Sequence, residues 1–377
     1  MNVATVAPGT YRQYTARHHQ FCLVTDDTLT TAVTLAGSDD AYSLVSRINA
    51  PAGTTLADLL TGQLPDDTDV LILTTRTELT TAPTELIADR TIAVLHLPDN
   101  DTVGELLQAL QDSDPQHLQD NAQPLYTTLS AGQALSVTDQ LTGVAAALTP
   151  GPGATRITAD LGPFHPGTLH HAPNGWITLS TDQALPFNGQ VAVKGRPAVH
   201  ATATGTATAA ERQRAYEGLL PLTRYPLVLT IEDGTVTDIK AVDGGSDSAA
   251  HTLQTLFDQN PHHRRITAIG FGLNPAVPAL RANTATHRAR ATTKGPTAHL
   301  TLGGLDGSLQ LLLPLDSSRI ETTDGHTTLA PGTTTRDPAE TNETGESGES
   351  GETCAITPPT TTGRKLNRVR SSSCGCH

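Results

Sequence analysis

The last seven residues of this 377-residue chain, SSSCGCH at 371–377, concentrate side-chain nucleophiles. The hydroxyls and thiols fall within six positions, at Ser371, Ser372, Ser373, Cys374 and Cys376. A dehydrated serine gives an alkene that a nearby thiolate, the reactive form of cysteine, can attack to form a thioether ring. Alternatively, serine or cysteine can cyclise onto the preceding carbonyl to give an azole. We therefore predict these five residues as sites of post-translational modification.

A second pair of candidate residues lies in the stretch 266–316. His299 falls in the strand-like run TAHLTLG, and Asp316 ends the next apolar run, LQLLLPLD. Imidazole and carboxylate are common ligands of Zn and Fe, but catalytic sites normally use three protein ligands. The pair therefore indicates either a working metalloenzyme or an enzyme fold that has lost its metal.

Composition excludes several classes of function. The formal net charge is −14, which argues against a nucleic-acid binder and against an anionic membrane surface. No apolar run approaches the roughly 20 residues that a membrane-spanning helix needs. The N-terminus lacks a basic region followed by an apolar one, so we expect no secretory signal and a cytoplasmic protein.

Cysteine is unevenly distributed. The first 353 residues contain only Cys22, whereas Cys354, Cys374 and Cys376 fall near the end of the chain. A disulfide framework would distribute its cysteines through the folded part. We therefore do not expect structural disulfides.

Residues 1–153 alternate strand-like and helix-like segments, which predicts an α/β domain with a parallel sheet and covering helices. Leucine spacing favours helices at 55–60 and 103–110, and a further helix is expected at 133–148. The run PGPG at 150–153 marks a boundary. The expected strands of this part are Phe21–Val24, Ala32–Leu35, Asp69–Leu73 and Thr91–Leu95.

Residues 154–330 predict a β-rich α+β domain. EDG at 232–234 is a tight hairpin turn, and Asp247–Phe257 is the expected helix, capped by Ser246. The expected strands are Arg156–Asp160, Trp176–Leu179, Gln190–Lys194, Leu227–Ile231 and Val236–Val242.

The remainder predicts a disordered tail in two parts. Residues 331–362 form a linker rich in Glu, Gly, Ser and Thr, where nothing can bury surface. Residues 363–377 form a basic segment followed by the terminal peptide. Their basic residues are a release point for a protease, a contact for an acidic modifying enzyme or a solvated charge cluster: Arg364, Lys365, Arg368 and Arg370.

The run IGFGLNP at 269–275, followed by the strands of His299 and Asp316, resembles the aminopeptidase T-like metallopeptidases and the related 2,5-dihydroxypyridine dioxygenases. In that superfamily a Gly-x-Gly-x-Asn-Pro turn precedes a strand with a metal-binding His, then a strand with a His-x-Asp pair. The segment 226–245 looks like the family's Glu-Asp-Gly hairpin, and 175–195 like its substrate-domain strands. The resemblance covers 160–320 well, and 20–160 only in architecture.

The resemblance carries over two metal ligands. His299 matches the first metal His, and Asp316 matches the Asp of the His-x-Asp pair, whose His position holds Pro314. The Glu expected two residues before the Gly-x-Gly is Ala268, and the Gly-Glu pair expected within 181–186 is missing. We therefore predict a pseudoenzyme without a cofactor. The alternative is an active peptidase or ring-cleaving dioxygenase that binds Zn or Fe through His299, Asp316 and a further ligand.

The terminal peptide looks like the core of a ribosomally synthesised and post-translationally modified peptide. The resemblance implies that the folded part acts as a large leader. The expected partners are peptide-modifying enzymes and a protease or exporter. A homodimer is a further possibility. A third hypothesis is that Cys374, Cys376 and His377 bind Cu(I) or Zn, since two thiolates and an imidazole suit these metals.

Overall fold

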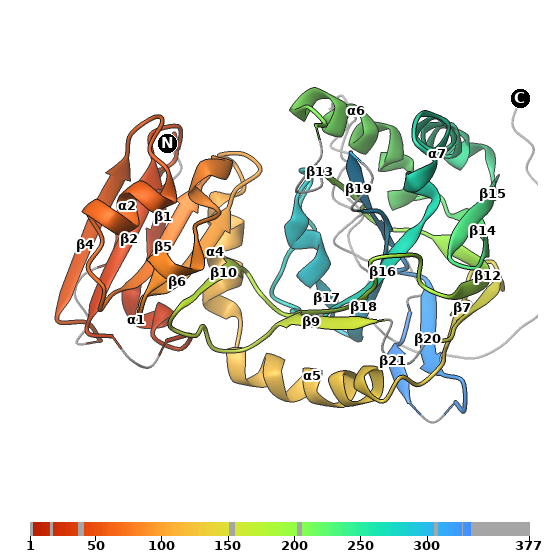
Figure 1. Ribbon diagram of the computed structural model, residues 1–377, viewed down its shortest axis with the longest axis horizontal. Coiled ribbons are helices and arrows are strands. Elements are labelled where there is room, and N and C mark those ends of the chain that lie inside the picture. Colours follow the sequence, from red (N-terminus) through yellow and green to blue (C-terminus); the bar gives the residue numbers. More distant parts are fainter. Residues whose placement is uncertain are drawn as a thin grey trace, which may run out of the picture. The chain divides into compact units, whose positions relative to one another are not determined.

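Buried apolar runs near the N-terminus form a parallel sheet (Figure 1). The computed structural model describes residues 3–15, 18–36, 41–150, 155–201, 206–304, 308–325 and 327–332. The sheet order is β10-β6-β5-β2-β4. Its strands are β2 (Gln20–Asp26), β4 (Leu44–Ala50), β5 (Asp69–Thr74), β6 (Thr91–His96) and β10 (Thr168–Ala172). A separate parallel pair joins β1 (Val3–Val6) to β3 (Ala32–Leu35).

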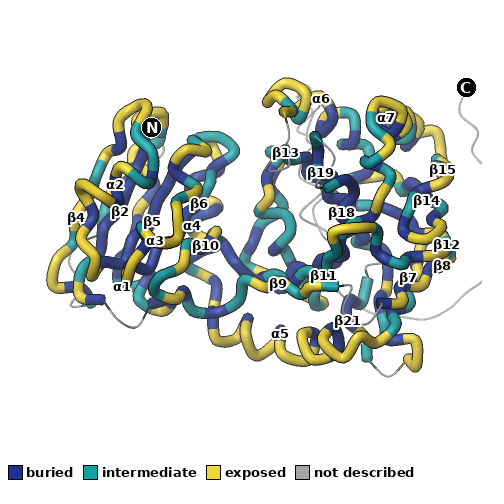
Figure 2. The backbone as a smooth tube through the Cα atoms, in the orientation of Figure 1, coloured by how far each residue is buried: buried dark blue, intermediate teal, exposed yellow. Residues whose placement is uncertain are grey.

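Alternation along the central strands divides the side chains between the two faces of this sheet. On β5, Leu71 and Leu73 belong to one apolar core, whereas Val70 and Ile72 belong to another. Residues of α1 (Pro8–Tyr11) and α4 (Val103–Asp112) complete the first core. Residues of α2 (Leu56–Gly62) and α3 (Thr84–Ile87) complete the second. Burial on both faces explains why the central strands β2, β5 and β6 are almost continuously apolar, and Figure 2 shows these strands as buried.

The later part of the chain forms two antiparallel sheets that share one core. The first, β13-β19-β18-β16-β11-β9, contains β9 (Arg156–Asp160), β11 (Trp176–Ser180), β13 (Ala198–Ala201), β16 (Ile266–Gly272), β18 (Gly295–Gly303) and β19 (Leu309–Pro314), with β17 (Ala291–Thr292) paired to β18. The second, β15-β14-β12-β8-β7-β20-β21, contains β7 (Leu135–Asp139), β8 (Ala145–Leu148), β12 (Phe187–Val193), β14 (Leu227–Glu232), β15 (Thr235–Ala241), β20 (Ser318–Thr322) and β21 (Thr328–Ala330). The predicted fold class, parallel α/β followed by antiparallel β, is confirmed.

Helices α5 (Pro115–Ser130), α6 (Ala209–Leu219) and α7 (Asp247–Gln259) pack against the antiparallel sheets. Capping side chains fix the first residues of α5 and α6. Asp114 accepts a hydrogen bond from the His117 amide, and Thr208 forms a capping box with Glu211. The short 3₁₀ turns are η1 (Thr77–Leu79), η2 (Leu220–Thr223), η3 (Gly244–Ser246), η4 (Pro261–Arg264) and η5 (Ala285–Ala289).

The helix predicted at 133–148 was wrong, because this segment is the β7–β8 hairpin. Its buried residues recur every second position: Leu135, Val137, Ala146 and Leu148. That period fits one face of a strand and no face of a helix. The helices predicted at 55–60, 103–110 and 247–257 are confirmed as α2, α4 and α7.

Segments on both sides of residue 153 contribute to both kinds of sheet. β10 pairs in parallel with β6, whereas β7 and β8 pair with β20 and β12. All the described residues belong to one compact unit, Met1–Thr335. Among them, no helix has the length and apolar character needed to cross a membrane.

Candidate functional site

His299 lies at the centre of the antiparallel sheet, between two residues singled out in the sequence. On one side it pairs with Gly270 of β16, and on the other with Pro314 of β19. A Cβ at residue 270 would overlap the His299 ring, so this glycine makes room for the imidazole. A Cβ at Gly272 would overlap the Arg290 carbonyl oxygen, which explains the second glycine of the motif.

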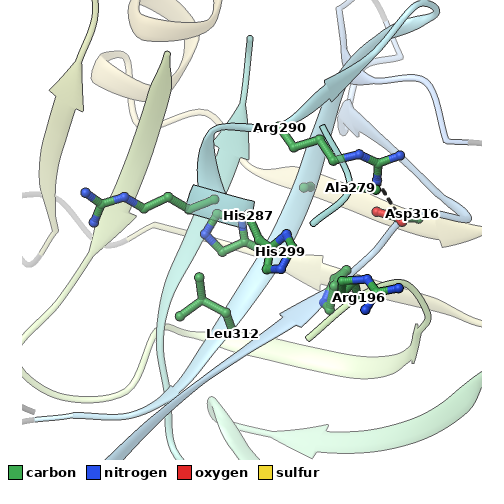
Figure 3. A pocket seen from close by; sticks show the side chains of 10 residues that line it. Arg196, Ala279, His287, Arg290, His299, Leu312 and Asp316 are labelled. Atoms are coloured by element: carbon green, nitrogen blue, oxygen red, sulfur yellow. Dashed lines mark ion pairs between the residues drawn. The ribbon is translucent and has the colours of Figure 1, made fainter. Parts of the chain in front are cut away.

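Asp316 follows β19, and its backbone amide donates to the Lys194 carbonyl oxygen at 3.1 Å. The side chain lies against Gly195, whose φ of +126° favours glycine. One carboxylate oxygen, Oδ2, is 3.8 Å from Nη1 of Arg290, and Figure 3 marks this ion pair by a dashed line. The Asp316 carboxylate is therefore engaged by a cationic side chain.

The fold brings the two predicted metal ligands to one small cavity of about 30 Å³. Figure 3 shows this cavity, which is lined by Arg196, Ala279, His287, Arg288, Arg290, Ala298, His299, Leu312, Pro314 and Asp316. The lining holds three arginines but only one carboxylate, and Pro314 contributes no ligating atom. The cavity has room for about one water molecule.

The residues present do not fit a Zn or Fe centre. Burial, and then the Arg288 guanidinium, lower the pKa of His299 to about 3, which shows that this position disfavours a positive charge. A divalent cation here would also face Arg196 and Arg290. In the described part of the chain, no group of three or more His, Cys, Asp or Glu residues could hold a metal ion.

Sequence reasoning missed a larger cavity of about 370 Å³ that also has Arg288 in its lining. Arg288 is in η5, and its guanidinium carbon lies 4.2 Å from the centroid of the Trp176 ring. His200 of β13 and His299 also line this cavity. Trp176 is the only tryptophan of the chain, which could have drawn attention to it. Nothing in the sequence distinguishes Arg288 from its neighbours.

A third cavity, of about 290 Å³, also has Arg288 in its lining, together with His96 and His171. Arg288 is thus common to all three cavities. Burial lowers the pKa of Arg288 itself. Burial also lowers the pKa of His96 and His171.

The histidines around Arg288 are uncharged near neutral pH. Burial, helped by Arg288 and Arg212, lowers the pKa of His200 to about 4. Burial lowers the pKa of His287 to about 3, and the nearby Arg196 and Arg290 add to this shift. The hydrogen bond between the His287 ring and the Ala282 carbonyl oxygen acts in the opposite direction and raises the pKa. The positive charge at this site therefore comes from arginine.

Three buried ring nitrogens at the two larger cavities have no hydrogen-bond partner within the described structure: Nε2 of His96, Nε2 of His200 and Nε1 of Trp176. Buried polar groups are normally paired. The site therefore presents polar nitrogens without a hydrogen-bond partner from the described protein.

The predicted modification sites and the basic residues near them lie outside the described residues: Ser371, Ser372, Ser373, Cys374, Cys376, Arg364, Lys365, Arg368 and Arg370.

Comparison with solved structures shows the fold. The chain is similar to 2,5-dihydroxypyridine dioxygenase from Pseudomonas putida KT2440, with a TM-score of 0.50 and 15% identity over 84% of this chain and 92% of that chain. It is also similar to wild-type AmpT from Thermus thermophilus, with a TM-score of 0.46 and 11% identity over 86% and 97% of the two chains. No protein-family model matches the sequence. No curated protein matches it either. The fold similarity expected from the sequence is thus confirmed.

Proposed function

We propose that the chain is a non-catalytic relative of this fold that carries its C-terminal peptide as the substrate of modifying enzymes. The observation that carries the proposal is the altered ligand set around His299. Pro314 and Ala268 supply no ligating side-chain atom, and Arg290 neutralises Asp316. Without a third ligand and with arginines around it, the cavity lacks the parts of a metalloenzyme site.

The position of the cysteines supports the tail as the place of thiol chemistry. In the described structure the only cysteine is Cys22, which is buried in β2. Burial raises the pKa of the Cys22 thiol, so its reactive thiolate form is disfavoured. A thioether or azole would therefore form at Cys374 or Cys376 rather than in the folded part.

The last described residues, 328–332, are anchored to the rest of the fold. Leu329 and Ala330 of β21 are buried, and the Pro331 carbonyl oxygen accepts a hydrogen bond of 2.9 Å from the Gln140 side chain. At Gly332, where φ is +67°, a Cβ would lie 2.8 Å from the backbone of Ser318. Contacts with Ser318 and Gln140 thus hold the last described residues of the folded part in place.

The proposal is tested by co-expressing the full chain with the genes adjacent to its own and measuring the intact mass. Dehydration of a serine, or cyclisation of a serine or cysteine onto the preceding carbonyl, removes one water, and oxidation to the azole removes two further hydrogens. Addition of a thiol to the alkene leaves the mass unchanged and is measured as the loss of one free thiol. Cys374→Ala and Cys376→Ala should eliminate the modifications that involve each thiol. The matched control Cys22→Ala should leave the modification pattern unchanged. An unmodified chain in the native host contradicts the proposal.

The competing hypothesis is an active metallopeptidase or dioxygenase, favoured by the shared cavity of His299 and Asp316. Metal analysis of the purified chain separates the two. Stoichiometric Zn or Fe that disappears in His299→Ala would support the enzyme. Metal that survives His299→Ala but disappears in Cys376→Ala would instead support binding by the tail, through Cys374, Cys376 and His377.

A further inference from the structure

We propose that the cavity of about 370 Å³ beside Arg288 binds a small organic ligand with an oxyanion group, either a carboxylate or a phosphate. The inference concerns only the described part of the chain and does not depend on the tail. It assigns a role to Arg288, which lines both this cavity and the smaller one of His299 and Asp316.

The first argument is the state of the Arg288 side chain. Its guanidinium stacks on the Trp176 ring, with 4.2 Å between its carbon and the ring centroid. Within the described residues it forms neither a hydrogen bond nor an ion pair. A guanidinium has five N–H donors in a planar fork that matches carboxylate and phosphate geometry. Stacking fixes the plane of this fork and leaves its donors available to a ligand.

A structural arginine of the same chain shows the contrast. Arg90 is buried and donates to the carbonyl oxygens of Leu60, Leu64, Pro65 and Leu86. It also pairs with Asp66 at 2.7 Å. Arginines buried for stability are saturated in this way. Arg288 has no comparable set of acceptors, which is the pattern expected of a side chain that awaits an anionic partner.

The second argument comes from two ring nitrogens in the lining of the same cavity. Nε2 of His200 and Nε1 of Trp176 are buried without a hydrogen-bond partner within the described structure. An indole nitrogen is only a donor, and a neutral imidazole presents one donor. Leaving such groups unpaired costs free energy that an acceptor in the cavity would recover. The Trp176 nitrogen therefore needs an acceptor such as an oxyanion, and Nε2 of His200 donates to the same acceptor when that nitrogen carries the ring proton.

The lining also fits the remainder of a small organic ligand. Its charged residues are Arg156, Arg288 and Asp182, so arginines outnumber carboxylates. Hydroxyls and an amide provide further polar contacts: Thr158, Thr178, Ser180, Thr181, Thr267, Thr301 and Gln310. Apolar side chains provide a surface for the carbon atoms of a ligand: Ala201, Ala268, Ala285 and Leu312. The volume falls within the range of about 300–1,000 Å³ usual for small-molecule sites.

The single tryptophan provides a direct readout, because any change in its fluorescence arises at Trp176. The full-length protein is titrated with sodium phosphate, with sodium benzoate and, at matched ionic strength, with sodium chloride. We expect a saturable fluorescence change with phosphate or benzoate and none with chloride. A phosphate response identifies a phosphate ligand, and a benzoate response identifies a carboxylate attached to a flat apolar body.

Variants separate the site from general charge effects. Arg288→Gln should weaken binding by roughly tenfold or more, since charged hydrogen bonds contribute about 1.5–3 kcal/mol. Arg288→Lys keeps the charge but loses the fork, so binding should fall to an intermediate level. The matched control Arg214→Gln removes the same charge from an exposed position on α6 and should bind like the wild type.

The outcomes decide the proposal. Failure of both phosphate and benzoate to give a saturable change overturns it, as does an equal response to chloride. Wild-type affinity in Arg288→Gln overturns it too. If Arg288→Gln does not fold, as judged by circular dichroism, then Arg288→Lys and His200→Gln take its place. Wild-type affinity in both of these variants would then contradict the assignment.

Discussion

The imidazole of His299 lies directly against the backbone of Gly270, its partner across β16 and β18. Gly270 does not have a positive φ, so its backbone would accept an alanine. The three atoms nearest to a Cβ at this position all belong to the imidazole, so the cost of a side chain here comes from that ring. A residue that looked like half of a metal site is held by packing against a glycine of the sequence motif.

We expect Gly270→Ala to lower the free energy of unfolding by about 1–3 kcal/mol, as overpacking in a core usually does. His299→Ala creates space, so the double variant should recover much of that loss. Urea denaturation of the two single variants and the double variant measures the coupling. Additive effects would show that the ring is not what excludes a side chain at residue 270.

Asn274 of the GFGLNP motif is expected to be structural. Its side-chain amide nitrogen donates to the Ser113 hydroxyl at 2.7 Å and to the Asn174 carbonyl oxygen at 2.8 Å, and its side-chain oxygen accepts from the Ala276 amide at 3.0 Å. Because the residue is fully buried, Asn274→Ala should cost about 2–4 kcal/mol of unfolding free energy. Ser113→Ala removes one of these partners and should cost clearly less. Equal losses in the two variants would refute the role of the network.

Arg90 and Arg288 should respond differently to loss of charge. Arg90→Gln leaves several buried carbonyl oxygens without a donor and should lower the free energy of unfolding by about 3 kcal/mol or more. Arg288→Gln removes no hydrogen bond within the described structure and should be much less destabilising. Thermal unfolding of both variants is the measurement. A larger loss for Arg288→Gln would mean that Arg288 mainly supports the fold.

His200 should make stability depend on pH. Its folded pKa of about 4 is below the usual value of 6.5, chiefly because of burial. Below pH 6.5 the unfolded chain binds a proton at His200 that the folded chain does not, so stability falls as pH decreases toward 4. The loss is at most about 1.4 kcal/mol per pH unit for one group.

The measurement is urea denaturation between about pH 7 and pH 5, the upper part of this window. His200→Gln should show a shallower loss of stability on acidification than the wild type. Buried His287 and His299 add effects of the same sign in both proteins, so the difference between the two slopes isolates His200. Identical slopes would contradict the lowered pKa.

The fold was largely predictable because its strands are marked by local apolar runs. Asp69–Leu73 and Thr91–Leu95 lie within β5 and β6, and the hairpin turn at 232–234 lies between β14 and β15. Helix α5 was missed because its sequence is polar and includes Pro124 within the helix. The β7–β8 hairpin was predicted as a helix because its alanines and leucines are compatible with both the helical and the strand period. The turn at Gly143, where φ is positive, is what separates the segment into two strands.

The candidate site was only half predictable. His299 and Asp316 were found from their motif and do line a common cavity. Arg288, Trp176 and His200 come from η5, β11 and β13, and no local pattern relates them. Their meeting depends on how the strands are ordered in the sheet, which is a property of the tertiary fold.

The burial of Cys22 in β2 gives the chain an internal chemical reference. The chain has four cysteines, and a thiol reagent that does not enter the native core spares Cys22. Denaturation should expose one additional thiol, whatever has happened to the others. A count of thiols before and after unfolding therefore reports, on one sample, both how much of the protein is folded and how many cysteines of the tail have already been consumed.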